Sequence, residues 1–266
     1  MRPPKGLLRL LVATLALVCL LNKSSLAQTT PTASTQAATT LRTAIAALSG
    51  TANVSDVTLT GSAEWIAGSD DETGTVTYKT SIGADHLALS LSNGQRNEIR
   101  SATGPTGSWS GSDGVSHPIA YHNLLTDPGW FPLFLLVGLN TSSSTVLTFV
   151  GTEMHNGVSA LHLSAFQQLD SAFGGDVAIQ KHLTQVHIFL DPLSLLPIAY
   201  VFNIHPDKNA LLDIPVEVRY SNYQVIGGAQ IPLHIQKYIN NVLNLDLNLQ
   251  NASLNTGLTP TQIGAQ

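Results

Sequence analysis

The chain has 266 residues with 12 basic and 17 acidic side chains, a net charge of −5, and only 11% of its residues are charged. The basic residues form no run, which disfavours nucleic acid and anionic membrane surfaces as partners, because neutralising phosphate groups requires clustered lysine and arginine. The sequence has one cysteine, Cys19, so no intramolecular disulfide is expected and stability must come from a buried core.

Residues 1–27 have the three parts of a secretory signal peptide. Arg2, Lys5 and Arg9 give a positive start, an apolar run follows, and small residues precede the predicted cleavage after Ala27. The apolar run is about a dozen residues long, shorter than the roughly 20 that a membrane-spanning helix needs, so we expect no stable membrane anchor. Cleavage would leave 8 basic and 17 acidic residues, a net charge near −9, on a periplasmic or extracellular protein.

The sequence after the signal begins with a stretch rich in Thr, Ala and Ser, residues 28–40, which has no apolar period and predicts a flexible lead-in. A short helix should follow, because apolar residues recur at helical spacing from Leu41 to Leu48 and Gly50 ends the pattern. The predicted regions are therefore a signal peptide (1–27), a lead-in (28–40), a single β domain (41–258) and a C-terminal tail (259–266).

From residue 54 the apolar period changes from that of a helix to that of a strand. Apolar and polar residues alternate from Val57 to Trp65, which predicts a strand with one buried face. Asn93-Gly94 is a strong signal for a two-residue hairpin turn. The first half is thus predicted to be an antiparallel meander, with further strands at 75–82, 86–92, 95–102 and around Trp109.

A dense apolar block, Trp130–Val137, interrupts the meander between two sheet segments. Residues 119–125 before it could form a short helix, and Asp127-Pro128-Gly129 predicts a turn. Two interpretations of the block remain open. It is either a buried core segment or a flap that packs over, or into, an apolar cavity.

The second half returns to strand-like alternation, which is cleanest in the leucines of residues 242–250. Gly227-Gly228 and Asn240-Asn241 predict tight turns, and Asp170–Asp176 is an irregular excursion. About ten or eleven antiparallel strands, each with one apolar face, predict a mainly β protein that wraps a sheet around its own core. The predicted strands of this half are 145–154, 158–166, 184–190, 198–205, 214–226, 230–239 and 242–250.

No catalytic motif occurs in the context that its chemistry needs. Gly107–Gly111 has the glycine spacing of a hydrolase nucleophile elbow, but Trp109 occupies the nucleophile position, so a turn and a strand are predicted. Glu64, Glu98 and Glu217 are isolated on strands and form no pair for glycosidase chemistry. No phosphate-binding or dinucleotide-binding glycine loop is found, and no cofactor is expected.

The nine histidines match neither the helical zinc motif nor the spacings of structural zinc sites, so no metal site is predicted. His187 and His205 lie on neighbouring predicted strands and could meet in space. Asp70, Asp71 and Glu72 predict a solvated turn, with calcium binding as the alternative.

Several short patterns of the C-terminal half follow one another in a recognisable order. Leu190-Asp191-Pro192 ends a strand, Leu196-Pro197 begins the next, another strand runs through Val218–Tyr223, and Gly227–Pro232 forms a hairpin with an edge proline. In this order, and in its signal peptide, short helix and meander, the chain resembles the periplasmic outer-membrane lipoprotein carrier family, the LolA-like and LolB-like proteins.

The resemblance implies an incomplete, half-open β-barrel built from the antiparallel meander, with a few short covering helices and an apolar concave face that holds acyl chains. Trp130–Val137 would be the natural cover, with the 41–48 helix as a second. Carriers of this family are commonly basic, whereas the mature chain is acidic, and the family's lid-locking arginine is not assigned to a residue here. The candidate ligand-cavity residues are Trp65, Trp109, Trp130, Phe131, Phe134 and Leu135.

We therefore expect an exported, non-catalytic binding protein that holds a lipid or lipoprotein acyl chain. Two alternatives stay open: a secreted hydrolase whose site the spacing hides, and a structural or adhesive β-protein of the cell envelope with a filled core. The sequence leaves the ligand's identity and the oligomeric state open.

Overall fold

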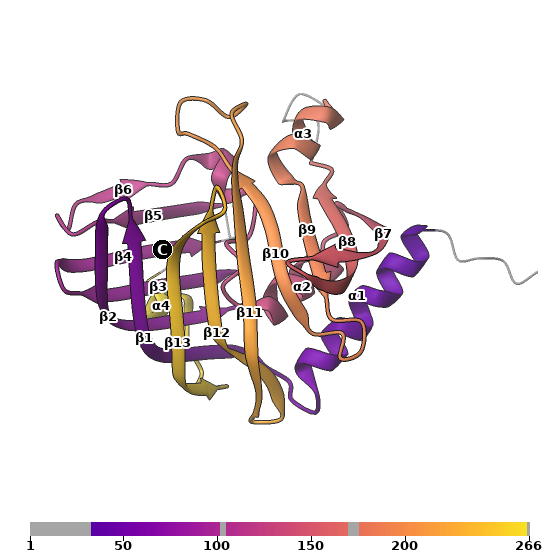
Figure 1. Ribbon diagram of the computed structural model, residues 1–266, viewed down its shortest axis with the longest axis horizontal. Coiled ribbons are helices and arrows are strands. Elements are labelled where there is room, and N and C mark those ends of the chain that lie inside the picture. Colours follow the sequence, from indigo (N-terminus) through magenta and orange to yellow (C-terminus); the bar gives the residue numbers. More distant parts are fainter. Residues whose placement is uncertain (1–32, 102–104, 170–175, 265–266) are drawn as a thin grey trace, which may run out of the picture. The chain divides into compact units, whose positions relative to one another are not determined.

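One antiparallel sheet of thirteen strands makes up most of the protein, as seen in a computed structural model that describes residues 33–101, 105–169 and 176–264 (Figure 1). In this part of the chain the sheet is open, because β6 and β7 are its two edges in the order β6-β5-β4-β3-β2-β1-β13-β12-β11-β10-β9-β8-β7. The prediction of a mainly β, half-open antiparallel sheet is confirmed. The strands are β1 (Asp56–Ala67), β2 (Asp70–Ser81), β3 (Ala84–Leu91), β4 (Gly94–Ser101), β5 (Thr106–Ser110), β6 (Ser116–Pro118), β7 (Thr145–His155), β8 (Val158–Gln167), β9 (Val186–Leu190), β10 (Pro197–Ile204), β11 (Ile214–Ile226), β12 (Ala229–Ile239) and β13 (Val242–Leu254).

The first and last strands along the chain, β1 and β13, pair with each other in the middle of the sheet and join its two halves. All other pairings are between strands that follow one another in the chain. The β1–β13 register runs from Val57 opposite Leu254 to Trp65 opposite Leu245, with one irregularity after Thr60. Figure 1 shows the resulting curvature, since β3–β5 run across the view whereas β11–β13 run along it.

Two of the predicted tight turns occur where the sequence placed them, whereas the turn predicted at Asn93-Gly94 is formed by Ser92 and Asn93, since Gly94 begins β4 opposite Leu91. Gly227 and Gly228 both have positive φ, at 58° and 89°, and so do Asn240 and Asn241, at 51° and 61°. Two consecutive residues with positive φ match the right-handed twist of the strands they join, which is why Gly and Asn are favoured there. Gly107–Ser110 lies in strand β5, so this segment is a strand, as predicted, and not a nucleophile elbow.

The first helix, α1 (Ala33–Ser49), begins eight residues before Leu41, so part of the stretch 28–40 is helical rather than a flexible lead-in. Its buried stripe consists of Ala37, Leu41, Ala44 and Leu48, all at most 1% exposed. The apolar pattern does not extend into the first two turns, because their core-facing residue is an alanine, which differs little in hydrophobicity from its neighbours. The helix lies against α2 and β7.

Four further short helices connect or follow the strands. The 3₁₀ helix η1 confirms the helix predicted at 119–125, whereas α3 had no counterpart in the sequence analysis. The expected C-terminal tail contains α4, which begins with a capping box between Thr259 and Gln262. Its Ile263 is fully buried and packs against Ala84. These helices are η1 (Tyr121–Leu124), α2 (Pro132–Thr141), α3 (Val177–Thr184) and α4 (Pro260–Ile263).

Some predictions concern residues that the structure does not describe. The signal peptide, residues 1–27, lies outside the described part, as does the excursion at 170–175. Within the described part, no helix has the length and apolar character needed to cross a membrane.

Asp56, the first residue of β1, forms hydrogen bonds with the residues that follow the last strand, β13. Its carboxylate accepts hydrogen bonds from the backbone N–H and hydroxyl of Thr256 at 2.8 and 2.9 Å and from the N–H of Gly257 at 3.0 Å. The Ser55 hydroxyl lies 3.0 Å from the same carboxylate. Burial alone would raise the pKa of Asp56, but these bonds to the ionised form hold it below its usual value.

We expect Asp56→Asn to lower the free energy of unfolding by about 1–3 kcal/mol at neutral pH, because an amide nitrogen cannot accept the bonds that the carboxylate accepts. The lowered pKa means that this stabilisation is full above the unfolded-state pKa of about 3.9 and is lost as the pH falls through the folded-state value. Urea unfolding of both proteins at several pH values should show the difference shrinking in acid. A difference that does not change with pH would contradict this account.

Candidate functional site

A cavity of about 360 Å³ lies under α2, between this helix and the concave face of the sheet. It is lined by the ends of β2, β3 and β4, by α2 and by Tyr200 of β10. Most of its side chains are apolar or aromatic, and the bulky ones include Tyr78, Phe131, Phe134, Leu135, Leu139 and Tyr200.

A second cavity of about 240 Å³ lies farther along the same face and is bordered by β1, β3, β4, β5, β12 and β13. Leu87 and Leu89 of β3 line it, while Asp85 of the same strand lines the first cavity. Alternate residues of a strand point to one side of a sheet, so the two cavities share one face. Trp130, at 2% exposure, borders the second cavity, and its neighbour Phe131 borders the first.

All six residues predicted as ligand-cavity candidates border one of the two cavities. Phe131, Phe134 and Leu135 line the first, and the three tryptophans line the second, namely Trp65, Trp109 and Trp130. Sequence reasoning placed them by their apolar bulk. It did not find the cavities' charged residues, which lie on strands without a motif. That a ligand occupies the cavities stays a prediction.

The apolar block Trp130–Val137 is both buried and a cover of the cavity. Pro132 is the first residue of α2, where its missing N–H costs no helical hydrogen bond. The helix is apolar on nearly all sides because it packs between the sheet and α1. Tyr220 donates a hydrogen bond from its hydroxyl to the carbonyl of Gly129, and so fixes the turn before the helix.

Gly129 is required at this turn. Its φ is 78°, and a Cβ there would lie 2.5 Å from an atom of the Tyr200 ring. The Asp127 carboxylate accepts a hydrogen bond of 2.7 Å from the Gly129 N–H, which closes the turn from the other side. The start of α2 is therefore held by contacts that only glycine permits.

Arg100 of β4 connects the sheet to the segment before α2. Its Nε donates to Glu98 Oε1 at 2.7 Å, and its Nη1 donates to the carbonyls of Asn123 at 2.9 Å and Thr126 at 3.3 Å. Glu98 is also near Lys237 of β12. Burial opposes the charge of Glu98, but the charges of Arg100 and Lys237 hold its pKa below its usual value.

Asp85 lines the first cavity, and its pKa is shifted in the opposite direction from that of Glu98. Burial, with the charge of Asp127 as the next cause, raises its pKa well above the usual range, and Arg100 compensates only in part. One of its carboxyl oxygens has no hydrogen-bond partner among the described residues. The raised pKa widens the pH range over which this carboxyl is neutral and can donate a hydrogen bond.

Glu72 is not part of a solvated turn, so that prediction is wrong. The turn is shorter than expected, and Glu72 lies in β2 at 2% exposure. Its carboxylate accepts from Arg96 Nη2 at 2.6 Å and from the Asn93 N–H at 3.3 Å. The Arg96 guanidinium in turn lies 3.7 Å from the centre of the Trp65 ring, at the border of the second cavity.

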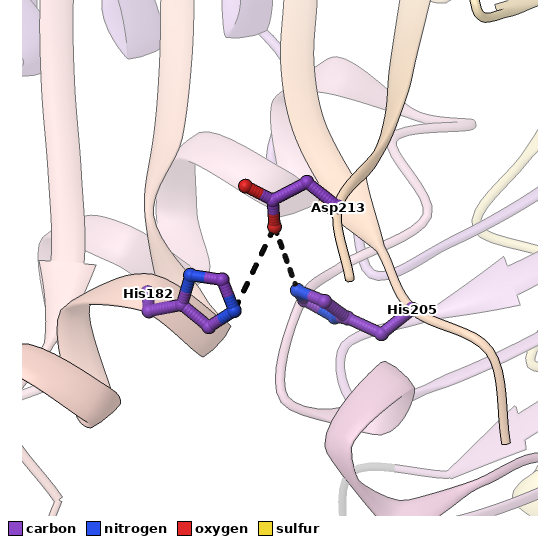
Figure 2. Close-up of side chains that lie close together, drawn as sticks. All are labelled: His182, His205 and Asp213. Atoms are coloured by element: carbon purple, nitrogen blue, oxygen red, sulfur yellow. Dashed lines mark hydrogen bonds and ion pairs between the residues drawn. The ribbon is translucent and has the colours of Figure 1, made fainter. Parts of the chain in front are cut away.

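The expected meeting of His187 and His205 does not occur. In the β9–β10 register, His187 lies opposite Val201, four residues before His205. His187 instead contacts His162, with 2.8 Å between Nδ1 and Nε2. His205 lies with His182 and Asp213, which come from α3 and the residue before β11 (Figure 2). No sequence spacing could reveal this group, because its members come from three separate segments.

No family model matches the sequence, and no curated protein is similar to it. Solved structures do match its fold. The chain covers 97% of a DUF1329 family protein from Desulfovibrio piger, using 87% of its own length, with a TM-score of 0.56 and 8% identity. It covers 96% of a domain assigned to an outer membrane lipoprotein-sorting protein of Vibrio parahaemolyticus, using 86% of its own length, with a TM-score of 0.54 and 12% identity.

A LolA superfamily protein from Nitrosomonas europaea matches to a similar extent, with a TM-score of 0.52, 12% identity, and coverage of 86% of this chain and 97% of that one. The chain has a LolA-like fold. The resemblance of the short sequence patterns to this group is thereby confirmed at the level of the fold. In the LolA-like fold of this chain, Arg100 joins the sheet to the segment before the covering helix α2 from one side, and Tyr220 joins them from another.

We expect Arg100→Met to lower the free energy of unfolding by about 2–3 kcal/mol, because it leaves Glu98 without its hydrogen-bonded cation and two carbonyls without a donor. The double variant Arg100→Met/Glu98→Gln should lose less than the sum of the single variants, since it leaves no unpaired carboxylate. Urea unfolding of the four proteins measures this coupling. Additive losses would show that the pair does not contribute to stability as a unit.

Proposed function

We propose that this protein is an exported, non-catalytic binding protein that holds an acyl chain of a lipid or lipoprotein in the cavity under α2. The observation that carries the proposal is the partly open, mainly apolar cavity between a covering helix and the concave face of an open sheet. Small-molecule sites are typically concave and apolar with a few polar groups, and they measure about 300–1,000 Å³. The volume of the larger cavity, about 360 Å³, falls within this range without the second cavity.

An acyl chain gains binding free energy from burial alone. Each CH₂ group removed from water contributes about 0.8 kcal/mol, so a long chain needs no charged anchor. Phe131, Phe134 and Leu135 offer the apolar surface on the helix side, and Tyr78 and Tyr200 offer it on the sheet side.

The charged residues between the cavities suit the polar end of such a ligand. Arg100 lines the first cavity, while Glu98 and Lys237 line the second. Glu98 lies near two cations, Arg100 and Lys237, while Asp85 and Asp127 of the first cavity also lie near Arg100. Arg100 and Lys237 are the groups that a carboxylate or phosphate at the end of an acyl chain would pair with.

Export is supported by two independent features. The first 27 residues have the sequence pattern of a signal peptide. One of the structures with the same fold is described as part of an outer membrane lipoprotein-sorting protein.

The cavities also disfavour a purely structural β-protein, which would have a filled core.

Gly138 allows a test that leaves the rest of the fold in place. It lies in α2, lines the larger cavity, and has no atom within 4 Å of the position that a Cβ would take. We expect Gly138→Phe to fill the cavity and to weaken the binding of a dansyl-labelled fatty acid at least tenfold. Fluorescence titration of the tag-free mature protein measures the affinity.

Gly138→Ala is the matched control. It should keep the affinity for the labelled fatty acid and raise the free energy of unfolding by about 0.5–1 kcal/mol, because alanine is the better helix former. Native mass spectrometry of the purified wild-type protein should also show bound lipid. Equal affinity of the Gly138→Phe and wild-type proteins would place the ligand outside this cavity, and no binding by the wild type would refute the proposed function.

A further inference from the structure

A group of two histidines and one aspartate lies at the end of β10, away from the proposed acyl-chain contacts. His182 belongs to α3, His205 directly follows β10 and Asp213 directly precedes β11. Figure 2 shows both imidazole rings turned toward one carboxylate oxygen of Asp213. One ligand atom of each residue lies within 4.8 Å of the other two, and this is the one such group of three in the described part of the chain.

The distances suit a tetrahedral ion. The Nε2 atoms of His205 and His182 lie 3.1 and 3.7 Å from Oδ1 of Asp213. With metal–ligand distances of about 2 Å, two ligands of a tetrahedral zinc ion lie about 3.3 Å apart. The ligand atoms of His182 and His205 lie at most 4.8 Å apart, so metal binding would draw the partly exposed His182 side chain toward His205 and away from the Ala210 carbonyl.

The surroundings hold His205 in place. Its backbone N–H and carbonyl make hydrogen bonds of 2.9 and 2.8 Å with the side-chain amide of Asn123. The ring of His122 lies edge-on to the His205 ring, with 5.8 Å between the centres. Nε2 of His122 is buried and has no hydrogen-bond partner among the described residues, which makes it an additional nitrogen donor close to the group.

We propose that His182, His205 and Asp213 bind a divalent transition metal ion, with zinc as the expected ion. Two imidazoles and one carboxylate are ligands of zinc, whereas calcium and magnesium prefer oxygen ligands alone. Three protein ligands leave a fourth position for water or for a nitrogen of His122. The ion would connect α3 to the β10–β11 connection in place of the hydrogen bond between His182 Nε2 and the Ala210 carbonyl, because the same nitrogen serves both.

The proposal is tested with tag-free mature protein that has been dialysed against a chelator. Titration with Zn²⁺ in competition with a chromophoric chelator should give one equivalent of binding, and Ca²⁺ and Mg²⁺ should not compete. His182→Ala and Asp213→Asn should each weaken zinc binding at least tenfold. Both side chains are partly exposed, at 27% and 45%, so these variants should fold.

His234→Gln is the matched control, because His234 also pairs with an aspartate, Asp246 at 2.9 Å, but does not belong to the group of three. This variant should bind zinc as the wild type does. A zinc concentration of 100 times the Kd should also raise the Tm of the wild type by about 5–10 °C and that of the His182→Ala variant by much less.

Absence of zinc binding to the folded wild-type protein would overturn the proposal. Unchanged binding by both His182→Ala and Asp213→Asn would overturn it as well, because the ion would then lie elsewhere. Gly138→Phe, which fills the acyl-chain cavity, should leave zinc binding unchanged, so this result is independent of the proposed function.

Discussion

An open sheet with an apolar concave face is stable in water only if other parts of the same chain cover that face. In this protein α1 and α2 provide the cover, and α2 is apolar on nearly all sides because it lies between the sheet and α1. A rigid helix cannot match a strongly curved surface everywhere, which leaves the two cavities on the concave face. The curved apolar face of the sheet therefore explains both the covering helices and the cavities beneath them.

The charged residues of the concave face are costly for the fold and are held by specific partners. Moving Glu98 and Arg100 away from water is unfavourable unless they satisfy each other's hydrogen bonds, and an apolar pair would fill the same space without this cost. Arg100 also bonds to the carbonyls of Asn123 and Thr126, so the pair determines where the segment before α2 lies. Their place between the cavities fits a ligand with a polar end.

The η1 segment connects the two sites of the molecule. Arg100 holds its backbone from the side of the first cavity, and the Asn123 side chain holds both backbone polar groups of His205 from the other side. A displacement of this segment would therefore affect the cavity and the histidine group together.

The sequence by itself determined most of the strands, the turns at Gly227-Gly228 and Asn240-Asn241 and the apolar block, because these depend on alternation and on local turn chemistry. It did not predict the short edge strand β6, and β2 begins five residues before the predicted start at 75. It also indicated the six bulky side chains that border the cavities, since they are the largest apolar residues near the sheet's ends and the cover. It could not reveal the first turns of α1, whose buried face is alanine, or the buried position of Glu72.

Tertiary structure alone decided which distant residues meet. The pairing of β1 with β13 brings residues about 200 positions apart into contact, and the histidine group collects side chains from α3, the end of β10 and the start of β11. Register decided that His187 faces His162 rather than His205, and a shift of one residue would have turned each of them to the other face. Such contacts depend on how the sheet curves and closes over its core, and no local pattern in the sequence encodes that.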